Sequence, residues 1–388
     1  MDLATRSRPQ TDVGGRLRRT YGFEEVSLVP GSITVDPTEV DTSVELGGQH
    51  LEIPFIAAAM DAVSDAEMAI RMHRLGGLAV VNLEGIWTRY EDAGPIIERV
   101  AAAADGEAAA AVLADAYAQP VREDLITALI TRIKAGGATA AVATTPASAW
   151  HHAELAAAAG ADLFVVQSQV SSARHISVSG RALSLADLTG GLSLPVLVGN
   201  TVSGDAAYQL MEQGAAGILV GVGPGAACTT REVLGIGVPQ VSATLEVADA
   251  RDRFREETGR YVPVITDGGM KTGGDIAKAI AAGADAVMLG SPLAAASEAP
   301  GLGFNWGMAA PSATLPRGTR IQIGERLPLE QILFGPSHTT HGTQNLVGAL
   351  RQSMGALGAS TIADMHQVEM IVAPTIATEG KSWQRAGA

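Results

Sequence analysis

Short, unbroken apolar runs recur along this chain, and most of them follow a glycine that ends a stretch of helical character. The phrase Ala-Gly-Ala-Asp at 159–162 leads into the run 163–168, and the same four residues at 282–285 lead into 286–291. Gln-Gly-Ala-Ala at 213–216 leads into 217–223 in the same way. The glycine stands where a helix ends, a position that favours a left-handed backbone. Runs without polar alternation predict parallel strands that are buried on both faces.

Eight apolar runs of this kind occur, and most are separated by enough residues for a helix. They lie at 54–60, 78–82, 138–144, 163–168, 195–200, 217–223, 262–267 and 286–290. Eight strand–helix units predict an α/β fold with a single (β/α)8 barrel of the TIM type. A doubly wound sheet is the alternative. The number of strands and the lack of an early dinucleotide-binding glycine motif disfavour it.

The repeat defines a barrel over residues 21–371, with four stretches that depart from it. We expect a basic N-terminal tail, a helical connection, an irregular excursion and a C-terminal tail that contacts a neighbouring subunit, at 1–20, 84–137, 303–345 and 372–388. The connection is too short to form a second domain. Its alanine-rich part, 101–118, predicts helix.

Composition narrows the class of protein. Hydrophobic residues make up 47% of the chain and charged residues 18%, which excludes a disordered chain. The formal charge of −14 argues against nucleic acid as a partner. No apolar run is long enough to predict a membrane span or a signal peptide. The single cysteine, Cys228, excludes an intramolecular disulfide framework and is typical of a cytoplasmic protein.

Polar and glycine residues gather where the predicted strands end, which is the catalytic face of such a barrel. Gly268 and Gly269 follow the seventh run, and Gly290 and Ser291 follow the eighth. Glycines at these two strand ends let backbone N–H groups approach a phosphate. Asp267 would then accept hydrogen bonds from ribose hydroxyls. Interpreted as ordinary turns, the same residues would bind nothing.

The loop after the sixth run is more specific. Its alternate glycines, Gly221, Gly223 and Gly225, exclude a helix and are poor strand formers. A dinucleotide-binding turn is disfavoured, because no acidic residue follows at the expected distance. The loop brings Cys228 to the catalytic face, where a nucleophile is favoured over an inert buried thiol. Its backbone carbonyls could also hold a monovalent cation.

The segment GVGPGAACTTREVLGIGVPQ, residues 221–240, resembles the cysteine loop of the IMP dehydrogenase/GMP reductase family. Residues 21–32, 54–69 and 262–291 resemble that family's entry segment, first strand and phosphate-binding half, and NWGMAAPS and GALRQSMGALGAST resemble its closing segments. The resemblance extends roughly from Tyr21 to Gly380. It is closest to a short branch of the family that lacks the CBS regulatory modules, for which 84–137 leaves no room.

The resemblance implies NAD-dependent oxidation of IMP to XMP, with Cys228 attacking C2 of the purine. Four groups of residues take roles by their match to the family's motifs. Asp267 would hold the ribose; Gly268, Gly269, Gly290 and Ser291 the phosphate; Met308 and Ala309 the base; and Gln167, Ser168 and Asn200 would lie at the nicotinamide. Met60 would also bind the substrate. Carbonyls of Gly223, Gly225 and Cys228 would bind K⁺, completed by Glu379, Gly380 and Lys381 of a neighbouring subunit. The family implies a homotetramer or octamer, and a mixed assembly with a second IMP dehydrogenase is a further expectation.

Several family residues are replaced in this chain. Gln167 stands for an aspartate, Leu219 for an arginine, Ala226 for a serine and Asn305 for a tyrosine. The mobile flap contains neither the Arg-Tyr pair of the dehydrogenases nor the glutamate of the reductases. Arg317 or Arg320, together with Thr230, would therefore position the hydrolytic water, unless both arginines are surface charges. Two alternatives stay open: an NADPH-dependent GMP reductase, and a non-catalytic nucleotide-binding paralogue that modulates an IMP dehydrogenase.

Overall fold

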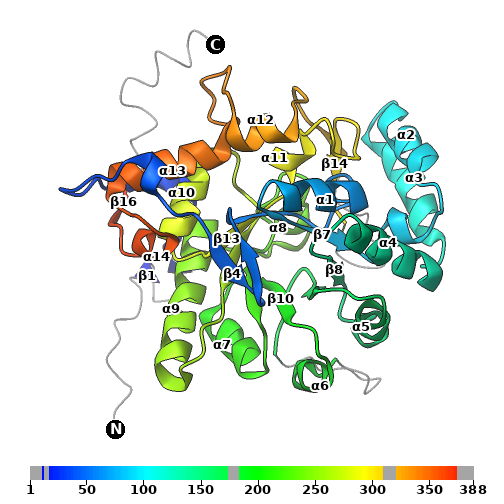
Figure 1. Cartoon of the computed structure of the whole chain (residues 1–388), viewed down its shortest axis with the longest axis horizontal. Helices are drawn as coiled ribbons and strands as arrows, with labels where there is room; N and C mark the ends of the chain where they lie inside the picture. The colour runs from blue at the N-terminus through cyan, green and yellow to red at the C-terminus, as the bar shows by residue number, and fades with distance from the viewer. Residues whose placement is uncertain (1–10, 13–16, 174–182, 309–319, 374–388) are drawn as a thin grey trace.

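The computed structural model describes residues 11–12, 17–173, 183–308 and 320–373. Eight parallel strands close into a barrel at its centre, in the order in which they follow one another along the chain (Figure 1). These strands are β6 (Phe55–Ala57), β7 (Leu78–Asn82), β8 (Ala141–Thr144), β9 (Leu163–Gln167), β10 (Val196–Thr201), β11 (Gly217–Val220), β12 (Val264–Asp267) and β13 (Ala286–Leu289). Each predicted run matches one of them to within one residue at its carboxyl end or contains it, so the (β/α)8 barrel is confirmed.

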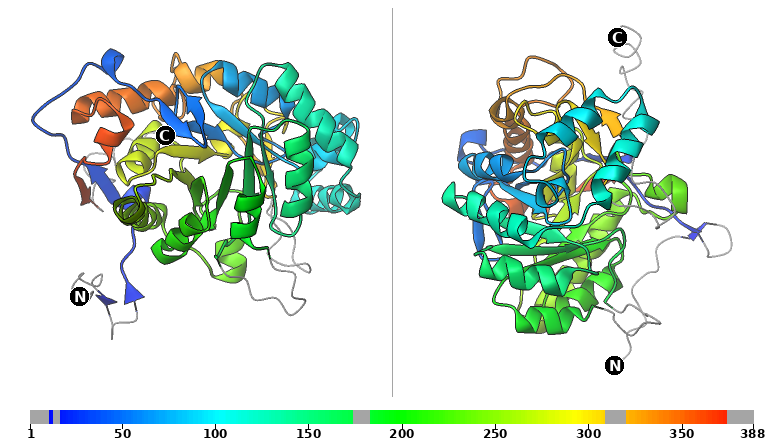
Figure 2. Two further views of the ribbon diagram at one scale, coloured as in Figure 1. Left: turned by 60° about the horizontal axis from the view of Figure 1, so that its bottom comes forward. Right: turned by 90° about the vertical axis from the view of Figure 1, so that its right-hand side faces the viewer.

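Helices surround the barrel and pack on the outward faces of its strands (Figure 2). The helices outside the long connection are α1 (Ala66–Arg74), α5 (Ala149–Ala158), α6 (Leu185–Gly191), α7 (Gly204–Glu212), α8 (Thr230–Leu234), α9 (Gln240–Thr258), α10 (Gly273–Ala281), α11 (Ser291–Ala294), α12 (Leu329–Phe334), α13 (Leu346–Leu357) and α14 (Ile362–Met365). Gly160, Gly214 and Gly283 have φ of 84°, 93° and 102°. The predicted role of these glycines at helix ends is therefore confirmed.

The inside of the barrel is a separate, solid core. Alternate strand residues such as Ile56, Leu163 and Leu219 point inward and are almost fully buried. A hairpin of β4 (Val44–Leu46) and β5 (Gln49–Leu51) adds Leu46 and Leu51 to this core. The hairpin therefore closes the amino end of the barrel and leaves the carboxyl end for ligands.

The connection from β7 to β8 is helical, as predicted, and lies beside the carboxyl end of the barrel. It contains the short 3₁₀ turn η3 (Ile86–Thr88) and three helices: α2 (Gly94–Ala102), α3 (Gly106–Ala118) and α4 (Glu123–Ala135). Figure 1 shows α2 and α3 next to β14 (Phe304–Trp306), which pairs with β15 (Arg320–Gln322). The predicted excursion at 303–345 is thus more regular than expected, because it holds this hairpin and α12.

The chain ends add short elements. The strand β3 (Val26–Leu28) pairs with β16 (Met370–Val372), and β1 (Thr11–Asp12) pairs with β2 (Leu17–Arg18). Two 3₁₀ turns, η1 (Phe23–Glu25) and η2 (Pro37–Glu39), lie between β2 and β4. Arg18 forms an ion pair with Glu246 on α9, so the inner end of the basic tail is attached to the barrel. Within the described ranges, no helix is long and apolar enough to cross a membrane.

Candidate active site

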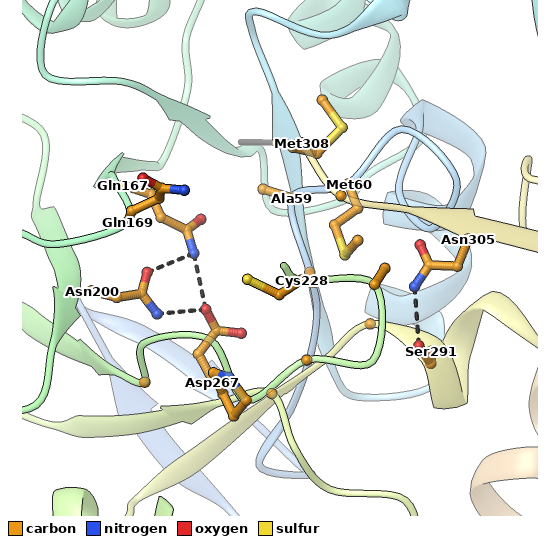
Figure 3. A pocket seen from close by; sticks show the side chains of 18 of the residues that line it. Ala59, Met60, Gln167, Gln169, Asn200, Cys228, Asp267, Ser291, Asn305 and Met308 are labelled. Atoms are coloured by element: carbon orange, nitrogen blue, oxygen red, sulfur yellow. Dashed lines mark hydrogen bonds between the residues drawn. The ribbon is translucent and has the colours of Figure 1, made fainter. Parts of the chain in front are cut away.

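A cavity of about 780 Å³ opens at the carboxyl ends of the strands (Figure 3). The structure brings fourteen of the predicted site residues together in its wall: Met60, Gln167, Ser168, Asn200, Gly223, Gly225, Cys228, Thr230, Asp267, Gly268, Gly269, Gly290, Ser291 and Met308. Five others, Ala309, Arg317, Glu379, Gly380 and Lys381, lie outside the described residues. These residues come from six of the eight strand ends and meet in one space, although they are far apart in sequence.

The cysteine loop is packed against the end of β12. A Cβ on Gly221 would lie 2.4 Å from the carbonyl oxygen of Asp267, and its φ of 147° is one that side chains rarely adopt. Gln240 on α9 donates to the carbonyls of Val220 and Asp267, at 3.0 Å each, and so ties β11 to β12. The Cys228 N–H donates to the Gly225 carbonyl at 3.0 Å. The thiol is exposed to the cavity, as a nucleophile requires.

Thr230 lies beside the thiol and is buried. The Sγ of Cys228 donates to Thr230 Oγ1 at 3.2 Å, and Gln169 Nε2 donates to the same oxygen at 3.2 Å. Both bonds use this oxygen as acceptor, so the hydroxyl proton can be donated to a group held above the sulfur. Gln169 was not predicted from the sequence. Its place just after the fourth strand was the available signal, because side chains at such strand ends face the cavity.

Asp267 is held by two amides, as Figure 3 shows. Its Oδ2 accepts from Gln167 Nε2 at 2.9 Å and from Asn200 Nδ2 at 2.8 Å. Gln167 Nε2 also donates to Asn200 Oδ1 at 3.0 Å. Burial raises the pKa of Asp267 to about 6, although the two amide bonds oppose this. Leu219, which replaces the family's arginine, is fully buried in the barrel core and brings no charge to this group.

The residues predicted to hold a phosphate line the opposite end of the cavity. Gly268 and Gly269 have φ of 80° and 82°, so the turn after β12 depends on glycine. Asn305 Nδ2 donates to Ser291 Oγ at 3.1 Å and thereby orients the hydroxyl at the end of β13. Lys271 also lines the cavity and was not predicted. The sequence signal for Lys271 was its position four residues after Asp267, close to the predicted phosphate site. A basic side chain at that position can pair with a phosphate.

A second part of the cavity wall comes from the ends of β7 and β8. Asn82, Glu84 and Arg89 line it together with Thr144 and Thr145. Glu84 accepts from the Thr145 N–H at 3.0 Å and from the Thr145 hydroxyl at 3.1 Å, which fixes its carboxylate. This part of the wall was not predicted from the sequence. Among the described residues, no group of three or more metal-binding side chains occurs.

Arg320 is not brought to the cavity, contrary to the expectation that it positions water. Its guanidinium donates to the carbonyls of Val100, Ala101 and Ala103, at 2.8, 3.0 and 3.0 Å. It also stacks on Phe304, 4.3 Å from the ring centre. These carbonyls lie at the end of α2 and have no partner within the helix, so an arginine there is well matched to them.

We expect Arg320→Ala to lower the stability of the folded protein and to leave the reactivity of the Cys228 thiol almost unchanged. Loss of three hydrogen bonds and the ring contact should lower the free energy of unfolding by about 2 kcal/mol. Urea unfolding measures this, and the rate of Cys228 alkylation by iodoacetamide should stay within about twofold of wild type. Arg326→Ala, which removes one exposed bond to Ser297, is the control. A large change in alkylation without loss of stability would contradict this assignment.

A parallel α/β barrel with an exposed thiol and a carboxylate in one cavity at its carboxyl end has the arrangement of an enzyme active site. Comparison with known proteins gives the family. The IMP dehydrogenase / GMP reductase domain matches residues 20–308. An uncharacterized oxidoreductase of Mycobacterium leprae is 41% identical over 93% of this chain and 98% of its own length. The inosine-5'-monophosphate dehydrogenase of Methanocaldococcus jannaschii is 29% identical, over 90% of this chain and 92% of that protein.

A solved structure agrees with these sequence matches. The crystal structure of an IMP dehydrogenase/GMP reductase-like protein from Corynebacterium glutamicum has a TM-score of 0.88. It is 36% identical and covers 93% of this chain and 96% of that one. The chain therefore belongs to the IMP dehydrogenase/GMP reductase family and is an oxidoreductase of that family.

Proposed function

We propose that this protein oxidises IMP to XMP with NAD⁺ through a covalent bond between Cys228 and C2 of the purine. The observation that carries the proposal is the position of the thiol. It is exposed in the cavity between the carboxylate of Asp267 and the sulfur-containing wall of Met60 and Met308 (Figure 3). A nucleotide whose ribose meets Asp267 and whose phosphate lies at Ser291 would place its base beside this sulfur.

The proposed reaction has two stages. In the first, the Cys228 thiolate forms a bond to C2, and the hydrogen at C2 leaves with its electron pair as hydride. NAD⁺, when bound, supplies the acceptor for that hydride. In the second, water adds to C2, the carbon–sulfur bond breaks, and the thiol is regenerated as XMP leaves. Thr230, hydrogen-bonded to the sulfur at 3.2 Å, is the described group that we assign to orient the entering water.

The proposed nicotinamide site is formed by uncharged amide side chains. Gln167 and Asn200 lie at the ends of β9 and β10, and their hydrogen-bonding groups suit an uncharged carboxamide. The cavity that contains the thiol also extends to Glu84 and Arg89. Its size leaves room for a second ligand beside the nucleotide. For K⁺, the loop offers the carbonyls of Gly223, Gly225 and Cys228. The Gly225 carbonyl already accepts one hydrogen bond and keeps a second lone pair.

GMP reduction is the second candidate, and the position of Arg320 favours it. Oxidation of IMP needs an activated water, and Arg320 is engaged with the end of α2 instead of reaching the cavity. Reduction of GMP needs no water. The thiolate would add to C2, and ammonia would leave with a proton from a group such as Thr230. NADPH would then supply a hydride to C2, the carbon–sulfur bond would break, and IMP would leave with the thiolate restored.

The test is the absorbance of reduced nicotinamide with purified protein. Steady formation of NADH from IMP and NAD⁺ in the presence of K⁺ is the expected result. A single burst equal to the enzyme concentration would mean that hydride transfer occurs and that hydrolysis does not. No signal with IMP and steady consumption of NADPH with GMP would overturn the proposal in favour of the reductase. If both substrates bind and neither reacts, the protein is a non-catalytic nucleotide-binding paralogue.

A further inference from the structure

The connecting helix α3 contacts the cavity wall through a buried hydrogen-bond network. Tyr117 of α3 donates its hydroxyl to Asp61 Oδ2 at 2.8 Å. Trp306 Nε1, on β14, donates to the same Tyr117 hydroxyl at 3.2 Å. Asp61 and Trp306 are fully buried, and Tyr117 is 9% exposed. Three segments that are distant in sequence therefore meet at one phenol group.

Asp61 also orders the start of the connection. Its Oδ2 accepts from the Ile86 N–H at 2.8 Å, and its carbonyl accepts from Trp87 Nε1 at 3.3 Å. The turn at Gly85 lies so close that a Cβ there would be 1.9 Å from Asp61 Oδ1. The carboxylate thus ties the end of β6 to the connection that contains α2 and α3.

The network ends on a residue of the cavity itself. The Sδ of Met308 lies 3.4 Å from Tyr117 Oη and 3.4 Å from the Asp61 N–H. Met60, the residue before Asp61, lines the same cavity. Figure 3 shows Met60 and Met308 on one side of Cys228, away from Asp267. A base bonded to Cys228 would lie against these two thioethers, which suit the flat face of an aromatic ring.

We propose that Tyr117 is a positioning residue for the purine base, acting from α3 through Asp61 and Met308. This inference rests on the proposed function, because it assumes a purine nucleotide in the cavity. The connection between β7 and β8 then has a role in recognition as well as in linking two strands. Arg320 supports this role from the other side, because it joins the β14–β15 hairpin to the end of α2.

The test compares the binding of a nucleotide with the binding of its sugar phosphate alone, so that the contribution of the base can be measured. Tyr117→Phe keeps the ring and removes only the hydroxyl. We expect IMP to bind about tenfold more weakly, because Asp61 loses a hydrogen bond and the Sδ of Met308 loses its contact with the hydroxyl at 3.4 Å. Ribose 5-phosphate, which has no base, should bind within about twofold of wild type. Tyr90→Phe is the matched control. It removes a hydroxyl of the same helical cluster that donates to the Ala116 carbonyl at 3.2 Å rather than to a carboxylate.

Equal weakening of both ligands would show general damage and would overturn the inference, as would unchanged binding of IMP. A crystal structure of ligand-free Tyr117→Phe gives a readout that does not depend on the substrate. Met308 should be displaced while Cys228 and Asp267 keep their positions, and an unmoved Met308 would also overturn the inference. If the wild-type protein binds neither IMP nor GMP, the proposed function fails, and the position of Met308 alone decides the role of Tyr117.

Discussion

Replacing Cys228 with alanine is expected to lower turnover by at least about 1000-fold, because the bond to C2 can no longer form. The substitution leaves the cavity otherwise intact. Cys228 is exposed, and its thiol donates to Thr230 Oγ1 at 3.2 Å. Nicotinamide absorbance measures the loss in whichever direction the wild-type protein reacts.

Binding serves as the control for this variant. Nucleotide affinity should stay within about threefold of wild type, because Asp267 and Ser291 are untouched. In the wild-type protein, bound nucleotide should protect Cys228 from iodoacetamide, since both compete for the same face of the sulfur. Retained turnover in Cys228→Ala would exclude covalent catalysis and with it the mechanism that we propose.

Replacing Asp267 with asparagine is expected to have opposite effects on binding and on stability. The carboxylate would accept two ribose hydroxyls, and loss of its charge should weaken nucleotide binding about 100-fold at pH 8. The folded protein, in contrast, should become more stable at pH 8. The gain is at most about 3 kcal/mol, the difference between a pKa of about 6 and the ordinary 3.8.

The sign of the pH dependence follows from the direction of this shift. A carboxyl group whose pKa is raised in the folded state contributes stability below its unfolded pKa of 3.8. That contribution is lost as the pH rises through about 6. The stability advantage of Asp267→Asn should therefore vanish below about pH 4. Urea unfolding of both proteins between pH 4 and pH 8 tests this.

Nucleotide binding should change in the other direction. Wild-type affinity should fall as the pH drops through about 6, because a protonated Asp267 is a weaker acceptor. The nucleotide phosphate titrates at about the same pH, so the fall in wild type is compared with that in Asp267→Asn. A parallel fall in both proteins would mean that Asp267 does not contact the ribose.

Most of the fold could be predicted from the chain because its signals are local. Each apolar run that is buried on both faces contains a barrel strand, and glycines such as Gly160 and Gly283 end the helices before them. The site residues at strand ends followed from the same logic, since parallel strands bring their carboxyl ends to one face. Cys228, Asp267 and Asn200 were found in this way.

The errors have a common physical cause. The position of Arg320 depends on α2, a helix more than 200 residues earlier in the chain, and no local pattern links the two. The same holds for Gln169, whose bond to Thr230 joins the ends of two strands. Tyr117 is part of an alanine-rich helix. Its role depends on buried partners in other segments, which the sequence of the helix does not indicate. Long-range contacts of this kind depend on the assembled barrel.

The β4–β5 hairpin has a consequence for the order of events in a catalytic cycle. Leu46 and Leu51 fill the amino end of the barrel, so two ligands in the cavity share the entrance at the carboxyl end. Two ligands that enter through the same opening cannot pass each other inside the cavity. Whichever ligand lies deeper has to arrive first and depart last, and the steady-state inhibition patterns of the two products would reveal which one it is.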